Sequence, residues 1–200
     1  MLAKPAVTRQ PIIDVIRNRW SPRAFSERPV PPDVMVSLLE AARWAASCNN
    51  SQPWRFLVAS RDDADGHARL LAGLNEGNQR WAARAPVLMV VCAFQDLPSG
   101  RKSAHHWYDC GQAVAQLIAQ ATSHGLVAHQ MAGIQREVLI ESCAVPADHD
   151  VVCAIALGYP GEVSELPEDL AERERAERVR QPLATMVFTS RFGETLGPAS

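Results

Sequence analysis

The chain has 200 residues, of which 47% are hydrophobic and 21% charged, a composition typical of one folded globular domain. Twenty lysines and arginines against 22 acidic residues give a net charge of −2, which excludes the strong basic excess of a general nucleic-acid binder. The longest apolar run, residues 87–94, is far shorter than the roughly 20 residues that a membrane helix requires. The first residues have no apolar core typical of a signal peptide, and the scattered cysteines form no CxxC pair. We therefore expect one domain over residues 1–200, located in the cytoplasm, with neither nucleic acid nor a membrane as a partner.

Hydrophobic spacing predicts alternating helices and strands in the first half of the chain. Residues 10–19 carry three isoleucines at helical spacing, and residues 33–45 repeat apolar side chains at intervals of three and four. Pro53 disfavours helical geometry before it, so the second helix is expected to end near CNNSQP. The strands predicted next are 54–60, WRFLVAS, and 87–94, VLMVVCAF, the latter buried on both faces of a sheet. A short helical stretch, 67–74, separates them.

The second half continues the alternation. Residues 103–124 carry one apolar stripe and are expected to form the longest helix, with Gly125 as its C-terminal stop. Then come a short strand at 126–131, a helix at 134–142, a buried strand at 150–158, a charged and exposed helix or loop at 166–178, and a β-type run at 185–190. This pattern predicts an α/β or α+β protein with a sandwiched sheet. The alanine-rich long helix and a tail with no place in a compact core predict a homodimer.

Three polar clusters are the candidate binding residues, because the common motifs of several site types are absent from the sequence. No GxGxxG, GxxxxGK[ST], GxSxG or HExxH motif occurs, so a Rossmann site, a P-loop, a hydrolase elbow and a zinc site are all unsupported. The clusters are RNRWSPR at 17–23, SCNNSQPW at 47–54 and RVRQP at 178–182. Arginine and serine side chains can hold a phosphate by charge-assisted hydrogen bonds, and amides can both donate to and accept from a heterocycle edge. Each cluster alone is equally typical of an exposed turn.

Together and in this order, the clusters resemble the nitroreductase family of FMN-dependent oxidoreductases. The resemblance rests on RWSPRAF, ASCNNSQPWRF and RVRQP, with support from YDCGQAVAQLIAQATSHGLVAHQMAG and VVCAIALGYPG, and it covers nearly the whole chain. It implies an α+β fold whose central mixed sheet is sandwiched by helices. It further implies an intertwined homodimer, with a C-terminal extension on the partner and two FMN sites at the interface.

The resemblance also assigns roles to individual residues. Arg19 and Ser21 would bind the FMN phosphate and ribityl end, and Arg178 and Arg180 would complete the phosphate clamp. Arg23 would reach the pyrimidine edge of the flavin, where its charge favours the anionic reduced ring. The other implied cofactor-binding residues are Trp20 beside the clamp, Ser47, Cys48 and Asn50 from the partner subunit, and Gln130, Met131, Ala132 and Gly133 beside the ring. Gly133 fits this role because close backbone approach to a flat ring tolerates no side chain.

The implied activity is a two-step, ping-pong transfer. NAD(P)H docks over the bound FMN, gives a hydride and leaves, and a small acceptor such as a nitroaromatic or a quinone then uses the same space. Since the cofactor carries the redox chemistry, no catalytic side chain and no metal are predicted. Two alternatives stay open: a flavin store or sensor without NAD(P)H turnover, and a specialised enzyme acting on its own flavin or on a halogenated or heterocyclic substrate. The sequence does not distinguish NADH from NADPH or identify the acceptor.

Overall fold

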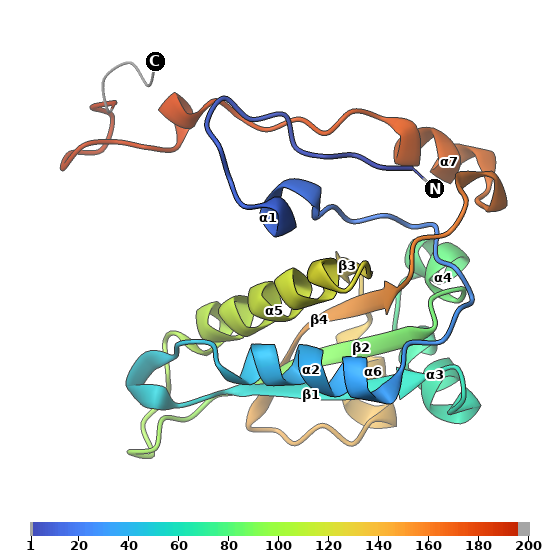
Figure 1. Cartoon of the computed structure of the whole chain (residues 1–200). Coiled ribbons are helices and arrows are strands. Elements are labelled where there is room, and N and C mark those ends of the chain that lie inside the picture. The colour runs from blue at the N-terminus through green and yellow to red at the C-terminus, as the bar shows by residue number, and fades with distance from the viewer. Residues whose placement is uncertain (1, 196–200) are drawn as a thin grey trace.

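The computed structural model describes residues 2–195, so residues 1 and 196–200 of the predicted domain lie outside the described part. Helices and strands alternate along the chain (Figure 1). In chain order they are α1 (Asp14–Asn18), α2 (Pro32–Arg43), η1 (Cys48–Asn50), β1 (Trp54–Ser60), α3 (Ala64–Ala72), α4 (Glu76–Ala82), β2 (Val87–Phe94), α5 (His106–Ser123), β3 (Val127–Met131), α6 (Arg136–Ser142), β4 (His149–Gly158), η2 (Val163–Glu165), α7 (Glu168–Arg175) and η3 (Leu183–Thr185).

The four strands form one sheet in the order β1-β2-β4-β3. All three pairings between neighbouring strands are antiparallel, whereas a mixed sheet was expected. The reason lies in the connections. β2 and β3, which α5 joins, run in the same direction, but β4 lies between them and pairs antiparallel with both. The α+β class is confirmed, and the sheet within one chain is antiparallel.

The core lies on both faces of the sheet. Along β2, Leu88 and Val90 pack with apolar residues of α3, α4, α6 and α7, and Met89 and Val91 pack with those of α2 and α5. Neighbouring side chains of a strand point to opposite faces, so this division follows from the pleat. The prediction of a central strand buried on both faces is confirmed. α5 ends as expected, with Gly125 in the left-handed region at φ 72°.

Several elements differ from the sequence-based prediction. Helix α4 was not predicted; it begins after Asn75, whose side chain accepts a hydrogen bond from the Asn78 backbone. Residues 166–178 contain a helix, α7, but one of its faces is buried, with Leu170 and Glu174 inaccessible. The first helix covers only Asp14–Asn18, and its flanking isoleucines are exposed.

The β-type run at 185–190 forms no strand. It begins within η3, and its only recorded pairing in the described chain is an isolated bridge between Phe188 and Thr195. A strand needs a neighbour to hydrogen-bond, and this segment leaves the body of the protein (Figure 1). The tail therefore has no sheet to join within its own chain.

The two ends of the chain run side by side (Figure 1). The Arg178 guanidinium donates to the Lys4 carbonyl at 2.5 Å, and the Lys4 ammonium donates to the Glu174 carbonyl at 2.8 Å. This pairing brings the N-terminal residues to the end of α7. Among residues 2–195, none of the helices has the length and apolar character to cross a membrane.

Candidate functional site

A cavity of about 230 Å³ lies where the first and third polar clusters meet, and we call it the arginine pocket. The first cluster contributes the turn of residues 19–23, here named the arginine turn, and the third contributes the chain after α7. Its charged lining comprises six cations, Lys4, Arg19, Arg23, Arg173, Arg178 and Arg180, and two carboxylates, Glu174 and Glu177. Positive charge therefore exceeds negative charge, as an anion site requires.

Hydrogen bonds to a buried carboxylate hold the arginine turn in place. Glu174 Oε1 accepts from the backbone N–H groups of Arg23, at 2.7 Å, and Ala24, at 3.2 Å, and Glu174 is only 1% exposed. The Arg23 guanidinium lies 3.7 Å from Glu174 Oε2. Within the turn, Arg19 Nη1 donates to Ser21 Oγ at 3.1 Å. The turn is thus fixed to α7, the helix that leads to Arg178 and Arg180.

Strand β3 supports the arginine turn from the sheet side. His129 Nδ1 lies 2.9 Å from the Pro22 carbonyl oxygen, and its ring contacts Trp81 with centroids 4.5 Å apart. Burial, together with the charges of Arg23 and Arg19, lowers the pKa of His129 to about 4, although the hydrogen bond to Pro22 acts in the opposite direction. His129 is therefore neutral near pH 7, and its Nδ1–H is the donor to the Pro22 carbonyl. This contact places β3 directly beside the turn.

The cations of the pocket repel one another. Burial lowers the pKa of Arg19, and the neighbouring charges of Arg178 and Arg180 lower it further. Burial likewise lowers the pKa of Arg178, with Arg180 adding to the effect. Guanidinium groups stay protonated in proteins, so these shifts express unfavourable interactions between fixed positive charges. A bound anion would relieve them.

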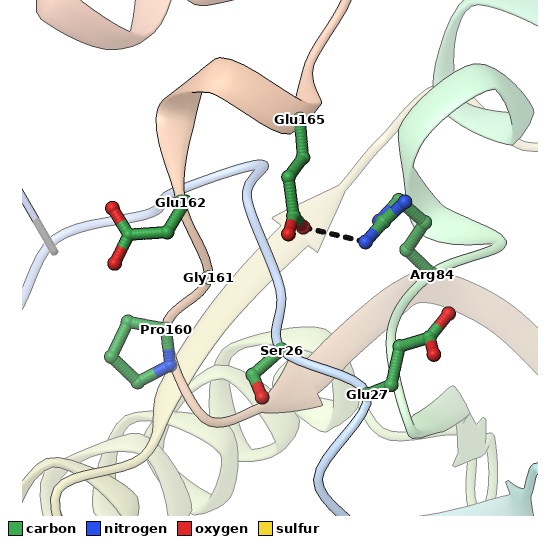
Figure 2. Close-up of a pocket in the computed structure, with 7 residues that line it drawn as sticks. All are labelled: Ser26, Glu27, Arg84, Pro160, Gly161, Glu162 and Glu165. Atoms are coloured by element: carbon green, nitrogen blue, oxygen red, sulfur yellow. Dashed lines mark hydrogen bonds and ion pairs between the residues drawn. The ribbon is translucent and has the colours of Figure 1, made fainter.

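A second cavity, of about 340 Å³, has the opposite character (Figure 2). Three of its lining residues are glutamates, and the arginine among them, Arg84, is paired with Glu165 at 2.5 Å. Figure 2 shows Glu165 pointing at Arg84, whereas Glu162 points away from it. Glu27 pairs with Arg61 at 3.2 Å. Although larger, this cavity is unsuited to a phosphate because its carboxylates outnumber its cations.

The second polar cluster lies at the other end of the sheet from α7 (Figure 1). Ser47, Cys48 and Asn50 are not part of the arginine pocket. The Cys48 backbone N–H donates to Asp109 Oδ2 at 3.0 Å, which ties this loop to α5. Asn50 has φ 52°, a left-handed conformation uncommon for a residue with a side chain and frequent at functional sites. One chain therefore does not bring this cluster to the pocket.

The stretch Gln130–Gly133 follows His129 in the chain, and none of its four residues lines the arginine pocket. Met131 is buried in the core, so only its backbone is available to a ligand. A Cβ on Gly133 would lie 2.3 Å from Asn75 Nδ2 and 2.8 Å from Asn78 Nδ2. The need for glycine thus has a cause within the protein, the close approach of two asparagines. The approach of a flavin is not required to explain it.

Comparison with known proteins identifies the relatives of this chain. The family model described as "Nitroreductase family" matches residues 16–159, which is most of the chain. The chain belongs to the nitroreductase family. An uncharacterized 15.4 kDa protein of Mycolicibacterium smegmatis is 35% identical over 148 residues, which cover 71% of this chain and 99% of that protein. A Methanothermobacter thermautotrophicus protein provisionally named NADH dehydrogenase/NAD(P)H nitroreductase is 27% identical over 168 residues, covering 78% of this chain and 81% of the relative.

A solved structure supports the same conclusion. An oxidoreductase containing FMN superposes with a TM-score of 0.87 at 38% identity, over 94% of this chain and 96% of the other. The predictions of the nitroreductase family, the α+β fold and an FMN-dependent oxidoreductase are thereby confirmed.

Sequence reasoning missed five lining residues of this nitroreductase-family chain: Lys4, Arg173, Glu174, Ala176 and Glu177. All five lie outside the segment that matches the family model. Arg173 and Glu174 belong to the charged stretch that was predicted to be exposed, although Leu170 and Ala171 suggested a buried face. Lys4 carries no sequence signal beyond its rarity, since the chain has only one other lysine, Lys102.

Proposed function

We propose that this chain is an NAD(P)H oxidoreductase that holds the phosphate of FMN in the arginine pocket. One observation carries the proposal: two segments far apart in sequence, RWSPR and RVR, converge on one cavity with an excess of positive charge. A phosphate monoester is close to doubly negative at neutral pH, so its charge complements this lining. When bound, FMN supplies the hydride and electron transfer between NAD(P)H and a second substrate.

Different side chains of the pocket would bind different parts of FMN. Arg19, Ser21, Arg178 and Arg180 offer donors to the phosphate oxygens, with the arginines able to bind in bidentate fashion. Arg23, on the sheet side of the turn near Trp81, would point its charge toward the flavin ring. Its positive charge would favour electron density on the pyrimidine edge.

Trp20 lines the pocket and lies under the Lys4 ammonium, with the nitrogen 4.9 Å from the ring centroid. We propose that it packs beside the phosphate. Gln130, Met131, Ala132 and Gly133, carried past the turn by β3, would lie beside the flavin ring and offer it mainly backbone groups.

The remaining predicted residues, Ser47, Cys48 and Asn50, would come from a second copy of the chain. Their distance from the pocket in one chain supports a homodimer in which each site is completed across the interface. Exposed apolar side chains also support it: Ile13 and Ile16 at the start of α1 and within it, and Leu183 and Phe192 in the tail, the last being 92% exposed. Soluble monomers rarely leave such groups uncovered together. Light scattering should give a dimer at micromolar concentration, and a single monomer peak would contradict this arrangement.

Arginine variants test the phosphate clamp. Arg19→Ala and Arg180→Ala should each weaken FMN binding by about 1.5–3 kcal/mol, because each removes a charged hydrogen-bond donor to the phosphate. Titration of apoprotein with FMN, followed by quenching of flavin fluorescence, measures this loss. Arg69→Ala, at an exposed position of α3, is the matched control and should bind as the wild type does. Full FMN affinity in either clamp variant would refute the assignment.

An asparagine variant tests the contribution of the second copy. Asn50→Ala should weaken FMN binding or slow flavin reduction while leaving the dimer intact. Unchanged affinity and unchanged reduction kinetics would remove Asn50 from the site. The proposed acceptors are nitroaromatics and quinones, and steady-state assays with each class will rank them.

A further inference from the structure

The N-terminal segment, residues 2–8, lies against the arginine pocket, and we call it the N-terminal arm. Its Lys4 lines the pocket together with Arg19, Arg178 and Arg180. The other lysine, Lys102, lies elsewhere and pairs with Asp96 at 2.8 Å. One of the two lysines of the chain is thus at the candidate phosphate site.

The segments that form the pocket also hold the arm in place. The Arg178 guanidinium donates to the Lys4 carbonyl at 2.5 Å, and the Ala6 backbone N–H donates to the Arg17 carbonyl at 2.7 Å. The arm therefore bridges the chain after α7 and the end of α1. These are the two segments whose arginines converge on the cavity, so the position of the arm is coupled to the geometry of the clamp.

The Lys4 ammonium has donor capacity to spare. Its Nζ donates to the carbonyls of Glu174, at 2.8 Å, and Ala176, at the end of α7. An ammonium has three N–H donors, and these are its two recorded acceptors in the described chain, so one donor is available to a ligand. The two carbonyls carry the partial negative charge of a helix C-terminus, which orients the ammonium without neutralising it.

The electrostatic surroundings of Lys4 favour an incoming anion. Burial lowers the pKa of Lys4, and the charges of Arg178 and Arg23 lower it further, against the opposing effect of Glu174. The ammonium thus lies among other cations, close to one buried carboxylate. A doubly negative phosphate would attract Lys4 and the neighbouring arginines and offset the repulsion between them.

We propose that Lys4 is a further phosphate-binding residue and that the N-terminal arm forms one wall of the phosphate site. The inference rests on the proposed function, since it takes FMN as the phosphate carrier. Lys4 lies outside the segment that matches the nitroreductase family model, residues 16–159. The arm therefore adds to the site a cation that the family segment does not contain.

The competing explanation is that Lys4 only caps α7. Riboflavin separates the two, because it has the flavin ring and ribityl chain but no phosphate. Lys4→Gln removes the charge and keeps a donor for the α7 carbonyls, and Lys102→Gln is the matched control. If Lys4 binds the phosphate, Lys4→Gln raises the Kd for FMN roughly tenfold and leaves the Kd for riboflavin unchanged. The FMN affinity of this variant should also depend less on salt, and Lys102→Gln should change neither Kd.

Equal losses of FMN and riboflavin affinity would overturn the proposal in favour of a structural cap, and so would an unchanged Kd for FMN. If wild-type protein binds neither ligand, the proposed function fails along with the inference. If the wild type binds FMN and Lys4→Gln does not discriminate, the inference alone fails.

Chemical protection tests the same point without a variant. In wild-type protein, FMN should slow the acetylation of Lys4 by acetic anhydride, measured by peptide mass spectrometry, and riboflavin should not. Lys102 should react at one rate under all conditions. Equal rates for Lys4 in FMN and in riboflavin would contradict direct contact with the phosphate.

Discussion

Glu174→Ala removes the carboxylate that ties α7 to the arginine turn. Glu174 Oε1 accepts two backbone N–H groups, from Arg23 at 2.7 Å and from Ala24 at 3.2 Å, at a position only 1% exposed. Hydrogen bonds to a charged group contribute about 1.5–3 kcal/mol each, and a buried N–H left without a partner is costly. We expect the variant to lose about 3 kcal/mol of unfolding free energy, equivalent to a Tm lower by roughly 6–12 °C for a domain of this size.

Thermal denaturation of the apoproteins, with FMN titration in parallel, measures both consequences. Glu174→Gln keeps an oxygen acceptor and removes only the charge, so it should lose less than half as much stability. The same change makes the pocket more positive, so its FMN affinity should equal or exceed that of the wild type. Glu172→Ala, at an exposed position of the same helix, should stay within about 0.5 kcal/mol of the wild type. A Glu174→Ala protein as stable as Glu172→Ala would refute the role assigned to this carboxylate.

Two further predictions concern His129 in β3 and Gly133, which follows this strand. The pKa of His129 is lowered from 6.5 to about 4 in the folded protein, so between these pH values the unfolded chain binds more protons than the folded one. Neutral His129 therefore contributes up to about 3 kcal/mol to the free energy of unfolding. This contribution is complete above pH 6.5 and is lost as the pH falls toward 4. Urea unfolding at pH 7 and pH 4.5 should show this loss in the wild type and a smaller one in His129→Gln, and identical pH dependence would contradict it. Gly133→Ala would drive a Cβ against Asn75 Nδ2 at 2.3 Å and disturb the cap of α4, at a cost of about 1–2 kcal/mol; a thermal melt matching that of the wild type would show that the asparagine moves aside freely.

The sequence predicted the elements whose patterning is strong. Strands β1 and β2 were predicted with their observed bounds because each is a run of β-forming apolar residues bounded by turn signals. Helix α4 was missed because EGNQRWA offers only Trp81 and Ala82 as a buried face, too little for a periodic signal. The antiparallel pairing was not predicted because strand order depends on tertiary packing, which local pattern does not encode.

Some residues of the candidate site could likewise be predicted from the sequence, and others could not. The arginine turn, Arg178 and Arg180 consist of residue types that bind anions, and the resemblance to the nitroreductase family assigned both segments to one phosphate site. Lys4 and Glu174 could not be found in this way. Their roles depend on tertiary contacts between the N-terminal arm, the arginine turn and the end of α7. A short sequence motif does not encode contacts between segments that are far apart in the chain. The tail likewise offers a strand-like pattern that has no sheet to join in one chain.

The most direct test of the proposed activity is the visible spectrum of the purified protein, recorded before and after anaerobic addition of NADH or NADPH. We expect flavin absorption bands that bleach with at least one of the two donors. Bands that persist with both would contradict the oxidoreductase and favour a flavin-binding protein without turnover. A colourless protein that also fails to take up added FMN would contradict the assignment of the arginine pocket itself.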